Sequence, residues 1–280
     1  MTNLAAFRRN DLLGALTNDE LARLSPELES IEMPAGFMAY QADLPQQHAY
    51  FPIDALVSLQ YVMRDGGSAE TAMVGHEGVV GISIFMGGDS TPGRAVVRSG
   101  GFGYRVKAPV LRHEFARAGP MMHLMLRYTQ ALLTQMSQTA VCNRHHSIDE
   151  QLCRALLLSL DSMQVSQFAM THELMANTLG VRREGITESA GRLQSAGLIR
   201  YRRGRIAVID RQGLTQRACE CYSVIQSEYR RLLPTRTAMP RASESTERLL
   251  GVNPLRRLPA AAHSYHRAGF TGSDARGRPP

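Results

Sequence analysis

The chain of 280 residues is poor in lysine, in cysteine and in long apolar stretches. Lys107 is its single lysine, and all other cationic side chains of this kind are arginine. No apolar run approaches the roughly 18 residues that a membrane-spanning helix needs, so we expect no transmembrane segment and no membrane partner. Arg8, Arg9 and Asp11 interrupt the N-terminal region where a signal peptide would be apolar. These absences favour a cytoplasmic protein.

The cysteines are too few for the disulfide framework of a chain this long. They are Cys142, Cys153, Cys219 and Cys221. On a helix, the thiols of Cys219 and Cys221 would diverge. His145 and His146 are adjacent, and adjacent helical residues point about 100° apart, so both cannot easily ligate one ion. We therefore expect no metal site and no cofactor, with a structural role for the histidines. A redox role for the cysteine pair is the minor alternative.

Signatures of catalysis are also missing. The sequence contains no Walker loop, no Rossmann fingerprint and no recognisable nucleophile–base set. His76 and Glu77 lie in a glycine-rich turn, but a cupin-type metal site would need a His-x-His partner that the sequence lacks. We expect no enzymatic activity.

The positive charge is unevenly distributed. The formal net charge is +7 and the sequence pI is about 9.6, which favours a polyanionic partner. Eight arginines but only three acidic residues follow Pro234, so most of this charge falls on residues 234–280. That segment has little periodicity and is predicted to be disordered. Arginine in place of lysine suits phosphate and guanine contacts, although a GC-rich genome would explain it equally well.

Residues 171–198 show the pattern of a helix-turn-helix. Thr171 suits the cap of a first helix, and Met175 and Leu179 share one face of it. Gly180 follows where such a helix commonly ends. A second helix would turn an apolar stripe inward; the stripe consists of Ile186, Ala190 and Leu193. The outward N-terminal part of the second helix would enter the major groove of duplex DNA. The predicted DNA-binding residues of this segment are Thr171, Arg182, Arg183, Glu184, Thr187 and Glu188.

An arginine-rich hairpin follows, with Arg203-Gly204 at its tip. Its cations would lie beside a phosphate backbone; they are Arg200, Arg202, Arg203 and Arg205. One alternative is an ordinary solvated helix pair with a basic edge hairpin. Another is a small-molecule sensor whose winged module contacts protein instead of DNA. We favour duplex DNA because Gly180, the small Ala176 and the apolar positions agree in register.

Residues 29–107 contain short β-type runs separated by turn residues, which predicts a sandwich or roll. The runs are 37–40, 55–61, 70–74, 95–97 and 103–106, with a hairpin signal at 65–67. Residues 1–28, 147–164 and 214–233 are predicted to be helical, the first of them as more than one short helix, one opened by Asn18.

A heptad seam marks the helix that follows the roll. Its positions alternate in steps of four and three; they are Met122, Leu126, Thr129, Leu133, Met136, Ala140 and Asn143. This seam predicts a parallel dimer helix, and the alternative is a long helix packed on its own roll. Both arrangements can hold at once. The expected fold class is α+β, with an N-terminal helix and roll domain (1–118), a dimerisation helix (119–146), a winged helix-turn-helix (147–233) and the basic tail (234–280).

This order of domains resembles the Crp/Fnr family of bacterial transcription regulators, the relatives of the cyclic-AMP receptor protein. The resemblance covers roughly residues 10–230 and is best at 171–198 and 74–81, whereas 142–148 is similar to one subgroup. It implies a cyclic-nucleotide-binding-like β-roll and a homodimer that regulates transcription from a near-palindromic operator, with RNA polymerase as a further candidate partner. Arg183 and Glu184 match the family's Arg-Glu pair and would contact bases. Glu188 replaces the family's second arginine, which implies a different half-site.

The resemblance also places an effector pocket in the roll. The corresponding residues are Glu77, Gly78, Gly81, Ile82, Arg94 and Ala95. Ile82 stands where the family has the glutamate that binds the ribose hydroxyl, and an unpaired buried hydroxyl costs about 1–3 kcal/mol. Arg94 remains for a phosphate, behind a longer loop, and Glu77 replaces the missing carboxylate only if that loop is rearranged. This pattern argues against cyclic AMP and leaves the small-molecule effector unknown. The first 141 residues lack cysteine, which argues against an iron–sulfur site.

Overall fold

The computed structural model describes residues 4–64, 67–163 and 167–234. Three short helices and a 3₁₀ turn come first: α1 (Leu4–Phe7), α2 (Asp11–Ala15), α3 (Asn18–Leu24) and η1 (Ser25–Glu27). Thr17, one residue before the predicted start, caps α3 in a reciprocal capping box with Glu20. The Asn10 side chain caps α2 and donates hydrogen bonds of 2.9 Å to the carbonyls of Pro52 and Gly78. These bonds fasten the N-terminal helices to the sheet region.

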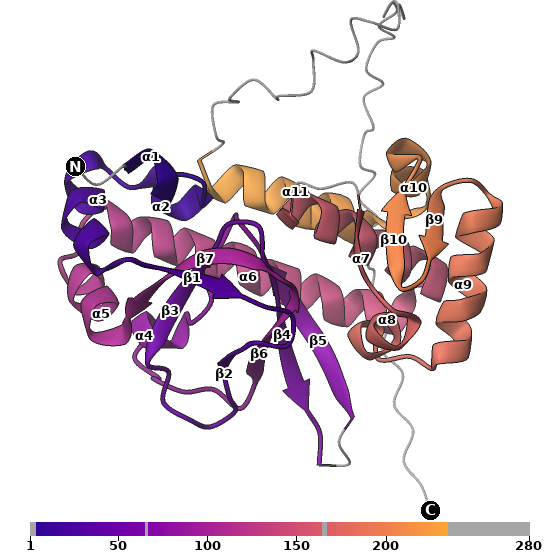
Figure 1. The fold of residues 1–280 in the computed structure, drawn as a ribbon, viewed down its shortest axis with the longest axis horizontal. Coiled ribbons are helices and arrows are strands. Elements are labelled where there is room, and N and C mark those ends of the chain that lie inside the picture. The colour runs from indigo at the N-terminus through magenta and orange to yellow at the C-terminus, as the bar shows by residue number, and fades with distance from the viewer. Residues whose placement is uncertain (1–3, 65–66, 164–166, 235–280) are drawn as a thin grey trace, which may run out of the picture. The chain divides into compact units, whose positions relative to one another are not determined.

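Two antiparallel sheets form the roll (Figure 1). Their strands are β1 (Glu29–Met33), β2 (Met38–Tyr40), β3 (His48–Pro52), β4 (Leu56–Val62), β5 (Ser68–Val74), β6 (Arg94–Ser99) and β7 (Gly101–Lys107). The orders are β1-β7-β3 and β2-β6-β4-β5, with the short helix α4 (Ser83–Met86) between β5 and β6. Alternation along β4 places Val57 and Leu59 in the core of the roll, whereas Leu56 packs with the C-terminal domain. One sheet therefore joins two cores.

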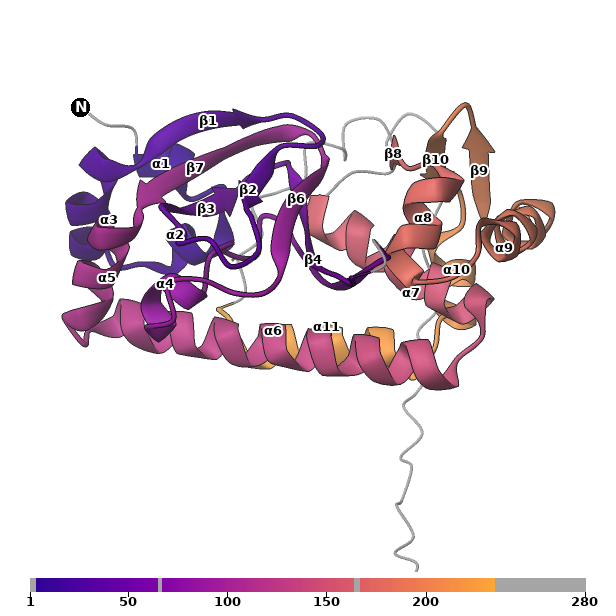
Figure 2. The same cartoon turned by 90° about the horizontal axis from the view of Figure 1, so that it is seen from below.

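A long helix connects the roll to the C-terminal part of the chain. After α5 (Ala108–Ala116), α6 spans Pro120–His145 and runs beside the roll and on to the winged domain, as Figure 2 shows. The last helix of the described residues, α11 (Glu220–Leu232), packs along α6. Among the described residues, no helix is both long and apolar enough to cross a membrane.

The winged domain combines helices with a small three-stranded sheet. Its elements are α7 (Ile148–Met163), β8 (Gln167–Ala169), α8 (His172–Leu179), α9 (Arg183–Ser195), β9 (Ile199–Arg202), β10 (Arg205–Val208) and α10 (Arg211–Arg217). The sheet order is β8-β10-β9. Ile186 and Leu193 of α9 are fully buried against Met175 and other apolar side chains of this domain. The predicted inward stripe of α9 is therefore its packing face.

The predicted fold class, with its roll, long helix and winged helix-turn-helix, is confirmed. The strands β1, β3 and β8 were not predicted, and residues 65–66 of the hairpin signal and 235–280 of the tail lie outside the described residues. The single helix predicted for 214–233 is wrong. It is interrupted at Ala218 and Cys219, whose ψ angles of 147° and 165° are extended. The four domain boundaries stay predictions.

Candidate nucleic-acid interface and sensor domain

The helix-turn-helix is built by two caps. The Thr171 hydroxyl accepts a hydrogen bond of 3.1 Å from the amide of Leu174 and opens α8. Gly180 closes the helix in the left-handed conformation, with φ = 65°, which a residue with a side chain adopts at a cost. Arg182 is the extended residue before α9. Thr171 is thus exposed and caps α8. This capping role does not depend on a contact with DNA.

The N-terminal end of α9 presents unpaired charge to the solvent. The predicted reading residues Arg182, Arg183, Glu184, Thr187 and Glu188 are all exposed. Within the described part of the chain, no ion pair or side-chain hydrogen bond engages the guanidinium of Arg182 or Arg183. Free cations at this end of the helix are available to an external anion or a base edge.

Two of the predicted reading residues also make contacts that position α9. The Thr187 hydroxyl donates to the carbonyl of Arg183 at 3.0 Å and lies 3.0 Å from Nδ1 of His172. The His172 ring stacks on Tyr201 of the wing, with ring centroids 4.4 Å apart. Glu188 lies 3.8 Å from Arg192. Thr187 therefore links α8 and α9, and through His172 the wing.

Arg192 ties α9 to the helix that precedes the motif. Its Nε and Nη2 donate to the two carboxylate oxygens of Asp149 on α7 at 2.9 and 2.6 Å. The pairing with Arg192 lowers the pKa of Asp149, so this carboxylate stays ionised. Such bidentate pairs fix orientation as well as distance. The helix α9 is consequently tied to α8 near its N-terminal end, through Thr187, and to α7 near its C-terminal end, through Arg192.

The wing gathers four exposed arginines on one hairpin. The residues are Arg200, Arg202, Arg203 and Arg205. Arg203 and Gly204 have φ angles of 51° and 72°, which is the twist of a tight two-residue hairpin turn. Arg202 and Arg205 are direct cross-strand partners. Like charges in that register destabilise a hairpin, so this arrangement opposes folding and favours an anionic ligand.

In the roll, Glu77 and Gly78 of the predicted effector pocket pack against the helices α7 and α6. Oε1 of Glu77 accepts hydrogen bonds from the Gly75 amide at 2.9 Å and from the Ser162 hydroxyl of α7 at 3.2 Å. Burial raises the pKa of Glu77. A Cβ on Gly78 would lie 2.4 Å from the hydroxyl of Tyr128 on α6, so only glycine fits there. These contacts engage Glu77 with the helix that opens the winged domain.

The other predicted pocket residues lie on either side of the loop between α4 and β6. Gly81 has φ = 108°, and the half-buried Ile82 precedes α4. Arg94 is half-buried, and its Nε donates to Oε1 of Gln60 at 3.1 Å. Ala95 is fully buried in the core of the roll. The residue that precedes α4 therefore has an aliphatic side chain. Among the described residues, the Arg94 guanidinium forms no ion pair.

The C-terminal part of the sequence matches a known domain family. Residues 150–217 match the family described as the Crp-like helix-turn-helix domain. This part of the chain is therefore a Crp-like helix-turn-helix domain. No curated protein matches the sequence.

Solved structures with this fold span most of the chain. A protein from Eubacterium rectale assigned to the Crp/Fnr family has a TM-score of 0.59 at 16% identity, covering 75% of this chain and 98% of its own. The c-di-GMP-responsive global regulator CLP of Xanthomonas campestris has a TM-score of 0.57 at 15% identity, covering 69% and 99%. A CRP/FNR-family transcriptional regulator from Thermus thermophilus has a TM-score of 0.53 at 20% identity, covering 68% and 98%. At these identities the likeness concerns the fold.

The predicted dimerisation seam is divided between two faces of α6. Leu126 and Leu133 are 47% and 52% exposed, and Ala140 is exposed as well. They lie seven residues apart, which keeps them on one stripe. Thr129 is instead buried, and its hydroxyl donates to the Met125 carbonyl. Met122 and Met136 are half-buried, and Met136 packs on the core of the roll. The stripe of Leu126, Leu133 and Ala140 is the part of the predicted seam that stays exposed and is available to a second copy of the chain.

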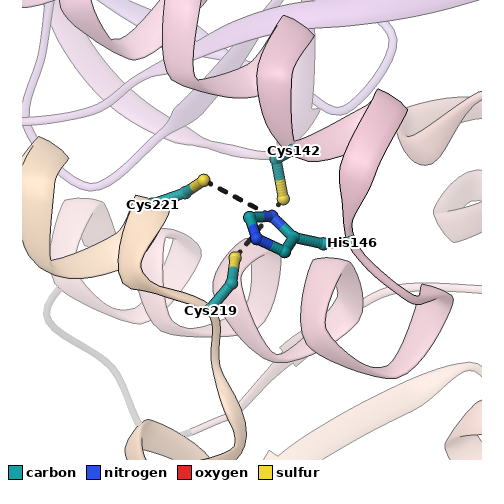
Figure 3. A group of neighbouring side chains, drawn as sticks. All are labelled: Cys142, His146, Cys219 and Cys221. Carbon is teal, nitrogen blue, oxygen red and sulfur yellow. Dashed lines mark hydrogen bonds between the residues drawn. The ribbon is translucent and has the colours of Figure 1, made fainter. Parts of the chain in front are cut away.

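Three cysteines and one histidine converge where α6 ends and α11 begins (Figure 3). The residues are Cys142, His146, Cys219 and Cys221, whose sulfur and nitrogen atoms all lie within 4.8 Å of one another. The Cys142 and Cys219 sulfurs are 3.4 Å apart, and the Cys221 sulfur is 3.6 Å from Nδ1 of His146. The three cysteines are buried. The hydrogen bond between the Cys142 and Cys219 thiols lowers the pKa of Cys219 to about 6 and raises the pKa of Cys142.

This cluster corrects two expectations. The thiols of Cys219 and Cys221 do not diverge, because Cys219 is the extended residue before α11 and lies outside the helix. His146 has likewise left α6, and only His145 keeps the exposed helical position. The argument from diverging thiols is therefore wrong, whereas the expectation of no metal site stays a prediction. The feature that brings these thiols together is the break between α10 and α11, which apolar periodicity does not reveal.

Proposed function

We propose that two copies of the chain bind a near-palindromic DNA operator and regulate transcription in the cytoplasm. The observation that carries this proposal is the surface formed by the N-terminal end of α9 and the wing, where exposed arginines lack partners within the described residues. In this architecture the recognition helices of a dimer enter successive major grooves about 34 Å apart. The exposed stripe of α6 supports a helix-to-helix dimer.

Within this surface we assign different roles to different residues. Arg183 and Glu184 would read base edges, with Arg183 suited to the O6 and N7 acceptors of guanine. Arg182 and the four wing arginines would contact phosphates and set the register. Thr187 and Glu188 would orient α9, because both already make contacts that fix it. RNA polymerase is a further proposed partner.

We propose that the roll binds an effector other than cyclic AMP. The carboxylate position before α4 is occupied by Ile82, and Glu77 is engaged by Gly75 and Ser162. Arg94 still offers a cation to a phosphate-bearing ligand. CLP, a protein of the same fold, responds to c-di-GMP, so that nucleotide belongs in any test of this roll.

Selection of bound duplexes from a random pool tests these proposals together. The full chain is used alone, with cyclic AMP and with c-di-GMP. We expect a near-palindrome to be enriched, and cyclic AMP to leave that enrichment unchanged. Enrichment that requires cyclic AMP would overturn our assignment of the roll. Binding of all duplexes without sequence preference, or a flat response of duplex affinity to salt, would overturn the DNA-reading role of α9.

A further inference from the structure

The four side chains at the junction of α6 and α11 have the spacing of metal ligands. In a tetrahedral zinc site the Zn–S bonds are about 2.3 Å and the Zn–N bond is about 2.0–2.1 Å, so neighbouring ligand atoms lie roughly 3.5–3.8 Å apart. The observed separations of 3.4 Å between two sulfurs and 3.6 Å between sulfur and nitrogen are close to these values. Figure 3 shows the four side chains pointing at one another.

We propose that Cys142, His146, Cys219 and Cys221 form a structural zinc site that fastens α11 to the end of α6. Thiolates and imidazole are the donors that zinc prefers, and four protein donors leave no open position for substrate. The site would therefore be structural and not catalytic. It joins segments 77 residues apart in the sequence.

The outer contacts of the cluster also fit a metal site. Nε2 of His146 lies 3.4 Å from a carboxylate oxygen of Glu220, so Nδ1 is the nitrogen that faces the thiols. Histidines that bind metal commonly donate their second N–H to a carboxylate, which fixes the tautomer and the ring orientation. Glu220 would be the positioning residue for His146.

A buried cation is present to balance the charge. One dication and three thiolates carry one net negative charge, and a buried charge requires a partner. Arg154 of α7 is 4% exposed, and its Nη1 donates to the Thr139 hydroxyl at 3.1 Å. Thr139 and Cys142 are three residues apart on α6, so the Arg154 guanidinium lies on the side of the helix that carries Cys142. The charge of Arg154 would thus balance that of the site, and metal binding would release the thiol protons.

A metal ion at this site would affect how the winged domain is attached to α6. His146 is the residue that closes α6, and α7, the first helix of the winged domain, begins at Ile148. A metal ion at this junction would fix the angle at which the chain leaves the dimer helix. Loss of the ion would loosen that junction without removing any residue of the α9 and wing surface.

The test is the metal content of the full chain, purified under reducing conditions without added metal. We expect one zinc ion per chain, and we expect a cobalt-substituted sample to show thiolate-to-cobalt charge-transfer bands. Cys219→Ser and His146→Ala should lose the ion. The matched controls are Cys153→Ala, at a buried cysteine of α7 outside the cluster, and His145→Ala, at the exposed neighbouring histidine. Both controls should keep it.

Thiol titration of the denatured wild-type chain makes every outcome decisive. Four reactive thiols and no bound metal would overturn the proposal. Two reactive thiols and no metal would show a disulfide instead, and would overturn it as well. Zinc retained in Cys219→Ser and His146→Ala would place the ion elsewhere. If a cluster variant does not fold, removal of zinc from the wild type by a chelator still decides, because the thiols should become reactive only as the ion leaves.

Discussion

Arginine has opposite surroundings in the winged helix and in the roll. On α9 and the wing, Arg183 and Arg202 are exposed and have no ion-pair partner among the described residues. On β6, the Arg98 side chain is 1% exposed, and its Nη2 lies 2.9 Å from a carboxylate oxygen of Glu70 on β5. The first kind of arginine contributes little to folding and is free to bind a polyanion. The second kind is required by the fold, because its removal leaves a buried charge.

The immediate partners of these arginines show the same contrast. Arg202 is opposite Arg205 in the wing, so the hairpin carries a repulsion that a bound anion would relieve. Glu70 accepts a hydrogen bond of 2.5 Å from Ser58 in addition to its contact with Arg98. Burial still raises the pKa of Glu70, since the cation and the hydroxyl offset only part of the desolvation.

Arg98→Met should have the largest effect on stability. Removal of one partner of a buried ion pair typically costs about 3–5 kcal/mol, because the other charge stays buried. Urea denaturation of the full chain measures this cost. Replacement of Glu70 by Leu in the same chain should recover part of it, and Arg202→Ala should leave stability within about 0.5 kcal/mol. If Arg98→Met lowers the free energy of unfolding by less than about 1 kcal/mol, the contrast between the buried and the exposed arginines is wrong.

Arg183→Ala should have the largest effect on DNA binding. A bidentate contact to a base is worth about 1–3 kcal/mol, which is roughly a 5- to 150-fold loss of affinity, confined to sequences with the preferred base. Competition between operator variants measures it. Arg112→Ala is the control, since Arg112 is an exposed arginine of α5 that pairs with Asp89 and has no part in positioning α9. An equal loss on every sequence would make Arg183 a phosphate contact.

The surface that we propose for DNA binding could be predicted from the sequence because its determinants are local. The cap at Thr171, the left-handed Gly180 and the wing turn at Arg203-Gly204 each depend on residues a few positions apart. Exposure of the reading residues then follows from the buried stripe of α9. The heptad seam was less informative, because the periodicity places residues on a face without indicating what covers it. Thr129 is covered by its own chain, whereas Leu133 is not.

The metal-ligand cluster could not be predicted because it depends on a short break in a helix and on contacts between distant segments. Periodicity across 214–233 predicts a continuous helix, on which Cys219 and Cys221 would point apart. The extended conformation of Ala218 and Cys219 reverses that expectation. The approach of Cys142 to Cys219 depends on the packing of α11 along α6, which no local pattern specifies. The buried pair of Arg98 and Glu70 was missed for the same reason.

Arg202→Ala should weaken DNA binding less than Arg183→Ala and with a different signature. A phosphate contact carries no sequence information, so the loss should be uniform across operators. The slope of log affinity against log salt concentration should fall in magnitude by about one. Arg112→Ala is the control, since Arg112 is an exposed arginine of α5 that pairs with Asp89. An unchanged slope for Arg202→Ala would remove the wing from the phosphate surface.

His172 should give the smallest effect, and its sign follows from its surroundings. Burial lowers the pKa of His172 below its usual 6.5, and the charge of Arg183 lowers it further. Above pH 6.5 the ring is neutral in the folded and the unfolded chain, so it contributes no pH dependence there. As the pH falls through 6.5, the unfolded chain binds the proton first, and stability declines until the folded pKa is passed. The urea midpoints of the wild type and of His172→Phe are measured from pH 7.5 downward in roughly half-unit steps. Below pH 6.5, the midpoint of the wild type should fall relative to that of His172→Phe. Phe keeps a ring against Tyr201 but removes the contact between Nδ1 and Thr187, so a difference that does not change with pH would show that His172 acts through that contact and not through its charge.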